Sequence, residues 1–221
     1  MDRRPAMARL ERTSPRAAGL YDPAHEHDGC GVACLARLDG QPIHEVIERA
    51  IATLDLLEHR GAAGADAETG DGAGILIQLP HEFFRERAGE FGLAPENVPG
   101  PGELAIAMCF LPSDPKRRRE IGHRIEEAVR MEGQIPLGSR EVPTDQSQCG
   151  RVAREAMPTI RQLMIRRGPE TEDAEAFERK LFVIRRTMEL ETSEVTFPSF
   201  SSRTIVYKGM LTAPQLANFY P

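Results

Sequence analysis

Cys30 is the residue whose type and position point most directly to chemistry. It begins the apolar run Cys-Gly-Val-Ala-Cys-Leu-Ala-Arg-Leu and directly follows the polar segment His-Glu-His-Asp-Gly at residues 25–29. A free thiol has a pKa near 8.5, whereas an α-amine has a pKa of about 7.7 to 8.0 and is partly neutral at pH 7. If residues 1–29 are removed, Cys30 therefore supplies both a nucleophilic sulfur and its own base.

Before such a cleavage the nitrogen of Cys30 is a peptide nitrogen without an available lone pair. Residues 1–29 are therefore expected to be a leader that keeps the site inactive. The alternative is that Cys30 is a small buried apolar residue, which is the usual role of a cysteine in an apolar run. Cys34, four residues further on, is assigned this structural role by preference.

The elements that would position Cys30 predict a mixed α+β domain. Residues 30–38 are expected to form a buried strand that ends at an Asp-Gly turn, and residues 43–57 an amphipathic helix, with Glu45 and Arg49 as an i,i+4 pair. Ser113 is expected to cap a later helix. Further strands are predicted over residues 75–79, 104–111, 161–167, 181–188, 195–197 and 203–207, and further helices over residues 80–91, 114–132 and 174–180.

Composition narrows the classes of partner. Lys and Arg total 28 against 34 Asp and Glu, which gives a net charge of −6 and argues against a surface for nucleic acid or anionic membranes. The apolar runs fall far short of the roughly 20 residues that a spanning helix needs. The amino-terminal segment lacks the apolar centre of a secretory signal, so a cytoplasmic location is expected.

The remaining motifs favour structural roles. The four cysteines match neither a disulfide framework nor a zinc pattern, so no metal site is expected. The basic run at residues 116–119 has no aromatic neighbours and is interpreted as a solvated helix face. The Gly-rich loop at residues 70–74 lacks the ending of a phosphate-binding loop, so its glycines are expected to allow close backbone approach beside the strand predicted over residues 30–38. Asp71 could hydrogen-bond within this turn, and its role is left unassigned.

Five segments, taken in order, resemble a known family. They are Leu-Tyr-Asp-Pro-Ala-His-Glu-His-Asp-Gly-Cys-Gly-Val at residues 20–32, His-Arg-Gly-Ala at 59–62, Thr-Gly-Asp-Gly-Ala-Gly-Ile at 69–75, Phe-Val-Ile-Arg-Arg at 182–186 and Ser-Arg-Thr-Ile-Val-Tyr-Lys-Gly-Met-Leu at 202–211. Together they resemble the class II glutamine amidotransferase domain that begins the large subunits of glutamate synthases.

The resemblance implies an N-terminal nucleophile hydrolase fold, in which two packed sheets lie between helical layers as an αββα sandwich. Residues 1–29 would be the propeptide and residues 30–221 the amidotransferase domain, incomplete at its carboxyl end. Cys30 would attack the side-chain amide of L-glutamine, form a glutamyl thioester and release ammonia.

Arg60 and Gly61 match the Arg-Gly pair that the family places after its first helix, near the nucleophile. A cation there would favour the thiolate and orient neighbouring groups. The alternative for Arg60 is a solvated arginine at a helix carboxyl end, favoured by the helix dipole. His59 is assigned a structural role.

The chain also departs from the family pattern. Ala33 and Cys34 stand where the family has Gly-Phe. The arginine that grips the glutamine carboxylate and the Asn-Gly pair of the oxyanion hole lie, in the family, beyond the position of Pro221. Residues 218–221 resemble the start of a helix, so a fragment is expected, and this polypeptide alone is expected to be an inactive glutaminase.

For the intact enzyme the resemblance implies FMN and an iron–sulfur cluster outside this segment, with no cofactor inside it. The implied partners are L-glutamine, the downstream synthase domains, and a reductase subunit or ferredoxin as electron donor. Two alternatives stay open. One is a non-catalytic assembly or regulatory domain of the same fold, and the other is a class II amidotransferase that serves a different acceptor.

Overall fold

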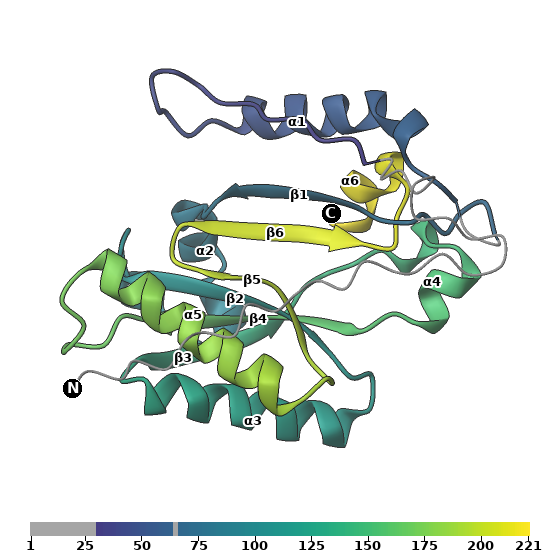
Figure 1. The fold of residues 1–221 in the computed structure, drawn as a ribbon. Coiled ribbons are helices and arrows are strands. Elements are labelled where there is room, and N and C mark those ends of the chain that lie inside the picture. Colours follow the sequence, from purple (N-terminus) through teal and green to yellow (C-terminus); the bar gives the residue numbers. More distant parts are fainter. Residues whose placement is uncertain (1–29, 64–65) are drawn as a thin grey trace, which may run out of the picture. The chain divides into compact units, whose positions relative to one another are not determined.

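A computed structural model describes residues 30–63 and 66–221, which form two antiparallel sheets flanked by helices (Figure 1). The strands are β1 (Ala73–Gln78), β2 (Leu104–Leu111), β3 (Ile135–Glu141), β4 (Thr159–Arg166), β5 (Thr196–Ser201) and β6 (Thr204–Gly209). The helices are α1 (His44–Leu56), α2 (His81–Glu86), α3 (Pro115–Met131), α4 (Arg151–Glu155), α5 (Ala174–Glu191) and α6 (Leu216–Phe219). Short 3-10 turns include η2 (Glu58–Arg60) and η3 (Ala88–Phe91).

The four-stranded sheet has the order β3-β4-β2-β5, and β1 pairs with β6 in the second sheet. Strand β2 is central, since it pairs antiparallel with β4 over its whole length and with β5 on its other edge. Strands β5 and β6 follow each other closely in the chain but belong to different sheets, so the turn between them joins the two sheets. The mixed α+β character expected from the sequence is confirmed.

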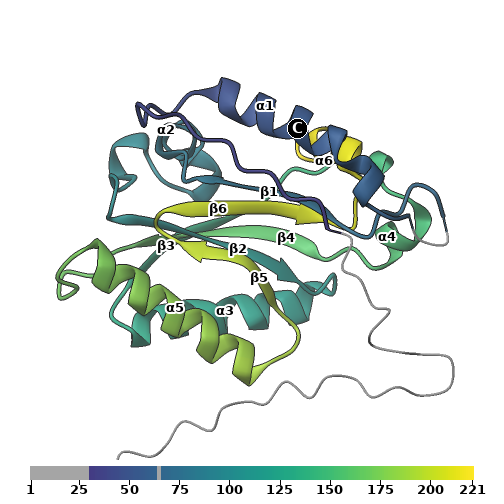
Figure 2. The same cartoon turned by 45° about the horizontal axis from the view of Figure 1, so that its top comes forward.

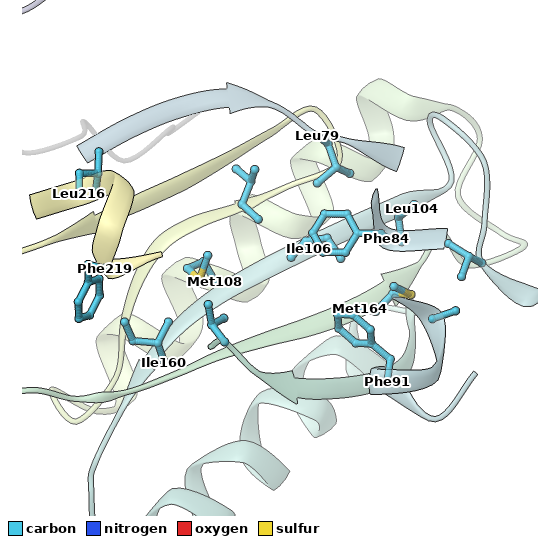
Figure 3. Packing of buried hydrophobic residues seen from close by; sticks show 14 of the residues in the cluster. Leu79, Phe84, Phe91, Leu104, Ile106, Met108, Ile160, Met164, Leu216 and Phe219 are labelled. Atoms are coloured by element: carbon cyan, nitrogen blue, oxygen red, sulfur yellow. The ribbon is translucent and has the colours of Figure 1, made fainter. Parts of the chain in front are cut away.

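The side chains of β2 alternate between two cores, as the period of two along a strand requires. Leu104, Ile106 and Met108 belong to the cluster between the two sheets, where they meet Phe84 from α2 and Phe219 from α6 (Figure 3). The three small residues between and after them, Ala105, Ala107 and Cys109, belong to the second cluster, under α3 and α5. Small side chains on that face let the helices approach the sheet closely.

Helices α3 and α5 cover the same face of the four-stranded sheet (Figure 2). Their buried residues recur at helical spacing and are Ile121, Ile125, Ala128 and Val129 in α3, and Phe177, Leu181, Ile184 and Met188 in α5. Asp114 caps α3, with its side chain accepting a hydrogen bond from the Arg117 amide at 2.7 Å. The expectation that Ser113 is the cap is therefore wrong by one residue.

Two predicted strands are corrected. Residues 181–188 are not a strand but belong to the second half of α5, where packing against the sheet buries Leu181, Ile184 and Met188 on one helix face. Residues 30–38 form no strand, because no strand among residues 30–63 and 66–221 supplies a hydrogen-bonding partner, and Val32 is 87% exposed. The turn that follows is present, with the Gly40 amide donating to the Arg37 carbonyl at 3.3 Å.

The sequence analysis also missed β3. Its residues Ile-Pro-Leu-Gly-Ser-Arg-Glu lack a clear alternation, and its register shifts between Pro136 and Gly138. In the part of the chain that the structure describes, no helix combines the length and the apolar character needed to cross a membrane.

Candidate nucleophile site

Cys30 is exposed and lies outside any helix or strand. This exposure contradicts the alternative in which Cys30 is a buried apolar residue. Cys34 is exposed as well, so the buried role expected for it is wrong. In both cases the reason is the absence of a paired strand over residues 30–38, without which no second layer covers these side chains. The expected leader, residues 1–29, lies outside the described residues.

The residue after Cys30 packs against the end of the first helix. A β-carbon placed on Gly31 would lie 3.1 Å from the Leu57 Cβ and 3.2 Å from the Arg60 Cβ, tighter than most real contacts. Gly31 thus lets the backbone of residue 31 lie directly on the turn that carries Arg60. The sequence predicted Arg60 near Cys30, and the structure brings Arg60 against the neighbour of Cys30.

The turn that carries Arg60 is fixed by backbone hydrogen bonds. The Arg60 amide donates to the Leu57 carbonyl at 2.8 Å, and the Gly61 amide donates to the Glu58 carbonyl at 2.9 Å. These bonds form η2, which directly follows α1. The Arg60 side chain is exposed.

Asp71 lies beside this turn, which the sequence analysis did not foresee. The Asp71 amide donates to the Ala62 carbonyl at 2.9 Å, and its Oδ1 would lie 3.6 Å from a β-carbon on Gly61. An isolated antiparallel bridge joins Ala63 to Gly70. The loop of residues 69–74 is thereby tied to the Arg60 turn. The sequence carried one signal of this arrangement, the polar and glycine-rich composition of both loops.

The glycines at residues 70–74 permit close backbone approach, but the expected partner is wrong: their neighbours come from the β6 region and not from residues 30–38. A β-carbon on Gly70 would lie 2.1 Å from the Leu211 carbonyl oxygen, and one on Gly74 would lie 2.6 Å from the Lys208 Cβ. Side chains larger than hydrogen cannot occupy either position without moving the backbone or a strand. These contacts attach the loop to β6 and to the residues after it.

Among the residues that the structure describes, no group of three or more His, Cys, Asp or Glu side chains could hold a metal ion. The basic run at residues 116–119 is partly neutralised by neighbours. Arg117 pairs with Glu194 at 2.5 Å and with Glu120 at 2.7 Å, which suits the predicted helix face better than a nucleic-acid surface.

The chain matches a known protein family over most of its length. The model of the class II glutamine amidotransferases matches residues 30–221, so the matched region starts at Cys30 itself. The chain is similar to the glutamate synthase (NADPH) large chain of Bacillus subtilis (strain 168), with 39% identity over 210 residues that cover 93% of this chain and 14% of that protein.

Two further relatives also match almost the whole chain over a small part of their own length. The chloroplastic ferredoxin-dependent glutamate synthase of Oryza sativa subsp. japonica is 37% identical over 95% of the chain and 13% of its own length. The glutamate synthase (NADPH) large chain of Azospirillum brasilense is 37% identical over 92% of the chain and 14% of its own length. The chain thus spans only a small part of the length of these curated relatives.

Proposed function

Because this chain belongs to the class II glutamine amidotransferases, we propose that residues 30–221 serve to hydrolyse the side-chain amide of L-glutamine, with Cys30 as the nucleophile. The observation that carries the proposal is that the family match begins at an exposed cysteine whose next residue packs against Arg60. Cys30 becomes the first residue of the mature chain when residues 1–29 are removed as a propeptide.

The free amine of Cys30 then acts as the base. It takes the proton of the thiol as the sulfur attacks the amide carbon of glutamine, and it returns a proton to the departing nitrogen, so that ammonia leaves and a glutamyl thioester remains. Water hydrolyses the thioester to glutamate and regenerates the thiol. Proton transfer of this kind contributes roughly 10² to 10⁴ in rate.

Arg60, Gly61 and Asp71 come from two loops that are joined to each other, and Arg60 contacts the residue after the nucleophile. Arg60 places a guanidinium on the turn against which Gly31 packs, where a positive charge favours the thiolate. Gly61 lies beside the Asp71 carboxylate, and Asp71 ties the glycine-rich loop to the same turn. We assign these three residues positioning roles.

The arrangement of elements supports an N-terminal nucleophile hydrolase sandwich with αββα layers. Helices α3 and α5 lie on one face of the four-stranded sheet, and the β1-β6 pair lies across its other face (Figure 2). Helix α1 packs by β1 and would form part of the fourth layer.

For the whole protein we propose a glutamate synthase, since the relatives named above carry that description. Ammonia released at Cys30 would pass to downstream synthase domains that hold FMN and an iron–sulfur cluster and that use 2-oxoglutarate. A reductase subunit or a ferredoxin would supply the electrons, and the enzyme would be cytoplasmic. Glutaminase activity is expected of the full-length protein and not of these 221 residues alone.

The first test is the amino terminus of the active enzyme. Intact-mass and terminal-peptide spectrometry of the full-length protein should find a chain that begins at Cys30 with a free amine. If fully active enzyme retained residues 1–29, Cys30 would have no free α-amine, and the proposed mechanism would be wrong.

The second test separates the nitrogen donors. Cys30→Ser in the full-length protein should abolish glutamine-dependent synthesis of glutamate and leave ammonia-dependent synthesis intact. Cys34→Ser is the matched control, because Cys34 is also exposed and lies four residues away. Unchanged glutamine-dependent activity in Cys30→Ser would favour a non-catalytic domain of the same fold, and glutaminase activity without glutamate synthesis in the wild type would favour a different acceptor.

A further inference from the structure

A cavity of about 160 Å³ opens between α3 and the face of the four-stranded sheet at β2, β3 and β4. None of the residues that line it belongs to the nucleophile site described above. Three arginines, Arg118, Arg119 and Arg161, line the cavity together with Ser139. Arg118 and Arg119 belong to the basic run that the sequence predicts to be a solvated helix face, but the fold brings them to the same cavity as an arginine from β4.

The Arg161 side chain is held in place by hydrogen bonding to Ser139, but another of its donors has no partner among the described residues. Its Nη2 donates to the Ser139 Oγ at 2.8 Å, whereas its Nε is buried and has no hydrogen-bond partner among the described residues. Buried donors are nearly always paired in native proteins, and a charged donor without a partner is especially unfavourable. The Arg161 Nε therefore calls for an acceptor that is not part of the described chain.

The Arg118 guanidinium is also held in place by hydrogen bonds within the protein. Its Nη1 donates to the Ser113 carbonyl at 2.8 Å and to the Thr159 Oγ1 at 2.9 Å, which fixes the guanidinium at the start of α3. Arg119 is exposed and adjoins it on the same helix. Both lie near the amino end of α3, where the helix dipole adds further positive potential.

Acidic residues nearby do not neutralise these charges. Glu126, the acidic residue among those lining the cavity, pairs with Arg130 at 3.0 Å. Glu141 lies opposite Arg161 in the β3-β4 register, but it is exposed, and no ion pair joins the two in the described structure. The cavity therefore presents three guanidinium groups with little compensation.

The floor of the cavity is apolar, in contrast to the arginines at its rim. Cys109, Leu111, Ile125 and Leu163 form an apolar base. Burial raises the pKa of the Cys109 thiol to about 12, so the thiol stays neutral at physiological pH. A cavity of roughly 150 Å³ is large enough to hold a benzene molecule. There is thus room for a short carbon skeleton beneath the charged rim.

We propose that this cavity binds a small organic oxyanion, whose charged group pairs with Arg118, Arg119 and Arg161 and whose short apolar body rests on the floor formed by Cys109, Leu111 and Ile125. Planar guanidinium groups bind carboxylates and phosphates through the same fork of donors, so both classes fit the rim. The apolar floor favours an organic anion over an inorganic ion. The proposal does not depend on the glutaminase function.

The test is calorimetric titration of the full-length protein at constant ionic strength, with glutarate, phenyl phosphate and inorganic phosphate as separate probes. We expect at least one organic probe to bind at a site whose affinity falls about 10-fold or more in Arg161→Gln and in Arg119→Gln. Arg124→Gln is the matched control and should retain binding, because Arg124 lies on the same helix but pairs with Glu191 at 2.9 Å.

The outcomes separate the ligand classes. Only binding that weakens in both arginine variants is assigned to this cavity. If glutarate alone binds in this way, the cavity is a carboxylate site, and if phenyl phosphate alone does, it is a phosphate ester site. If both do, the cavity recognises the oxyanion that the two probes share. The proposal is overturned if neither organic probe binds, or if inorganic phosphate binds as tightly as the organic probes, which would show an adventitious ion only. Unchanged binding in Arg119→Gln would overturn it too, because this exposed residue can be replaced without disturbing the core.

Discussion

Gly70 occupies a position where the backbone of the glycine-rich loop touches the backbone that follows β6. A β-carbon there would lie 2.1 Å from the Leu211 carbonyl oxygen and 2.4 Å from the Thr212 amide nitrogen. Neither neighbour is the end of a flexible side chain, so one of the two backbone segments would have to move.

We expect Gly70→Ala to lower the free energy of unfolding by about 2 to 4 kcal/mol, since overpacking against backbone leaves no inexpensive relaxation. Urea titration followed by circular dichroism measures this change. Gly89→Ala is the control, because nothing lies within 4 Å of a β-carbon there. It should be neutral or stabilising by up to about 1 kcal/mol. Equal stabilities of the two variants would contradict the close approach at Gly70.

Arg140 is a second residue whose environment makes a measurable prediction. Its side chain is 6% exposed, and its Nε donates to the Gln162 Oε1 at 2.7 Å while its Nη1 donates to the Glu90 Oε2 at 2.5 Å. The guanidinium also lies 5.3 Å from the ring centre of Phe83 and 5.5 Å from that of Phe91. The hydrogen bond from Arg140 lowers the pKa of the Glu90 carboxyl below its ordinary value of 4.5.

A lowered carboxyl pKa stabilises the folded state above the unfolded pKa, and this stabilisation is lost as the pH falls through the folded value. Glu90→Gln should therefore reduce stability at pH 7 and flatten the loss of stability below about pH 4.5. Unfolding titrations between pH 3 and pH 7 test this. Glu86→Gln is the comparison, because Glu86 is exposed and forms no ion pair with another described residue, and it should change the stability at pH 7 by less than about 0.5 kcal/mol. A Glu90→Gln profile parallel to the wild type would refute the linkage.

Helix α5 holds the turn that joins the two sheets. The Glu178 Oε1 accepts hydrogen bonds from the Ser202 amide at 2.5 Å, from the Ser202 Oγ at 2.6 Å and from the Ser201 Oγ at 3.1 Å. Because β5 ends at Ser201 and β6 begins at Thr204, this carboxylate fixes the crossing from one sheet to the other.

Glu178→Ala leaves a buried serine hydroxyl and an amide without their acceptor, and we expect a loss of about 1 to 3 kcal/mol. Glu175→Ala on the same helix removes only the exposed pair with Arg203 and should cost less than about 1 kcal/mol. Chemical denaturation of both variants provides the comparison. If Glu175→Ala were the more damaging change, the turn would not depend on Glu178.

At the level of elements, the spacing of apolar residues was enough to predict the helices and strands that bury one regular face. The strand predicted over residues 104–111 is β2 at the same bounds, and the helix predicted over residues 114–132 is α3 to within a residue. The pattern failed at residues 181–188, where a dense apolar cluster satisfies both periods and only packing against the sheet selects a helix.

For the whole described chain, α1 is the least buried long helix. It has no fully buried residue, whereas α3 and α5 each have four. Val32, Leu38 and Leu56 are exposed in and beside the same amino-terminal part. Few buried contacts imply low local stability for α1, even though seven of the eight residues of the central strand β2 are buried.

Hydrogen exchange measured by mass spectrometry on the 221-residue chain should reflect this difference. We expect the amides of α1 to exchange at least about 10-fold faster than those of α5, which corresponds to about 1.4 kcal/mol less protection. The amides of β2 supply the internal reference for global unfolding. Equal protection of α1 and β2 would show that α1 belongs to the same cooperative unit.

The sequence by itself determined the elements whose signal is local, and it identified Cys30, Arg60 and Gly61 as the candidates around one nucleophile. Only the tertiary structure decided that residues 30–38 lack a pairing strand, that Gly31 lies against Arg60, and that Arg161 joins Arg118 at one cavity. The reason is physical. Periodicity along the chain specifies which face of an element is apolar, but strand pairing and the meeting of distant side chains depend on which faces finally pack together.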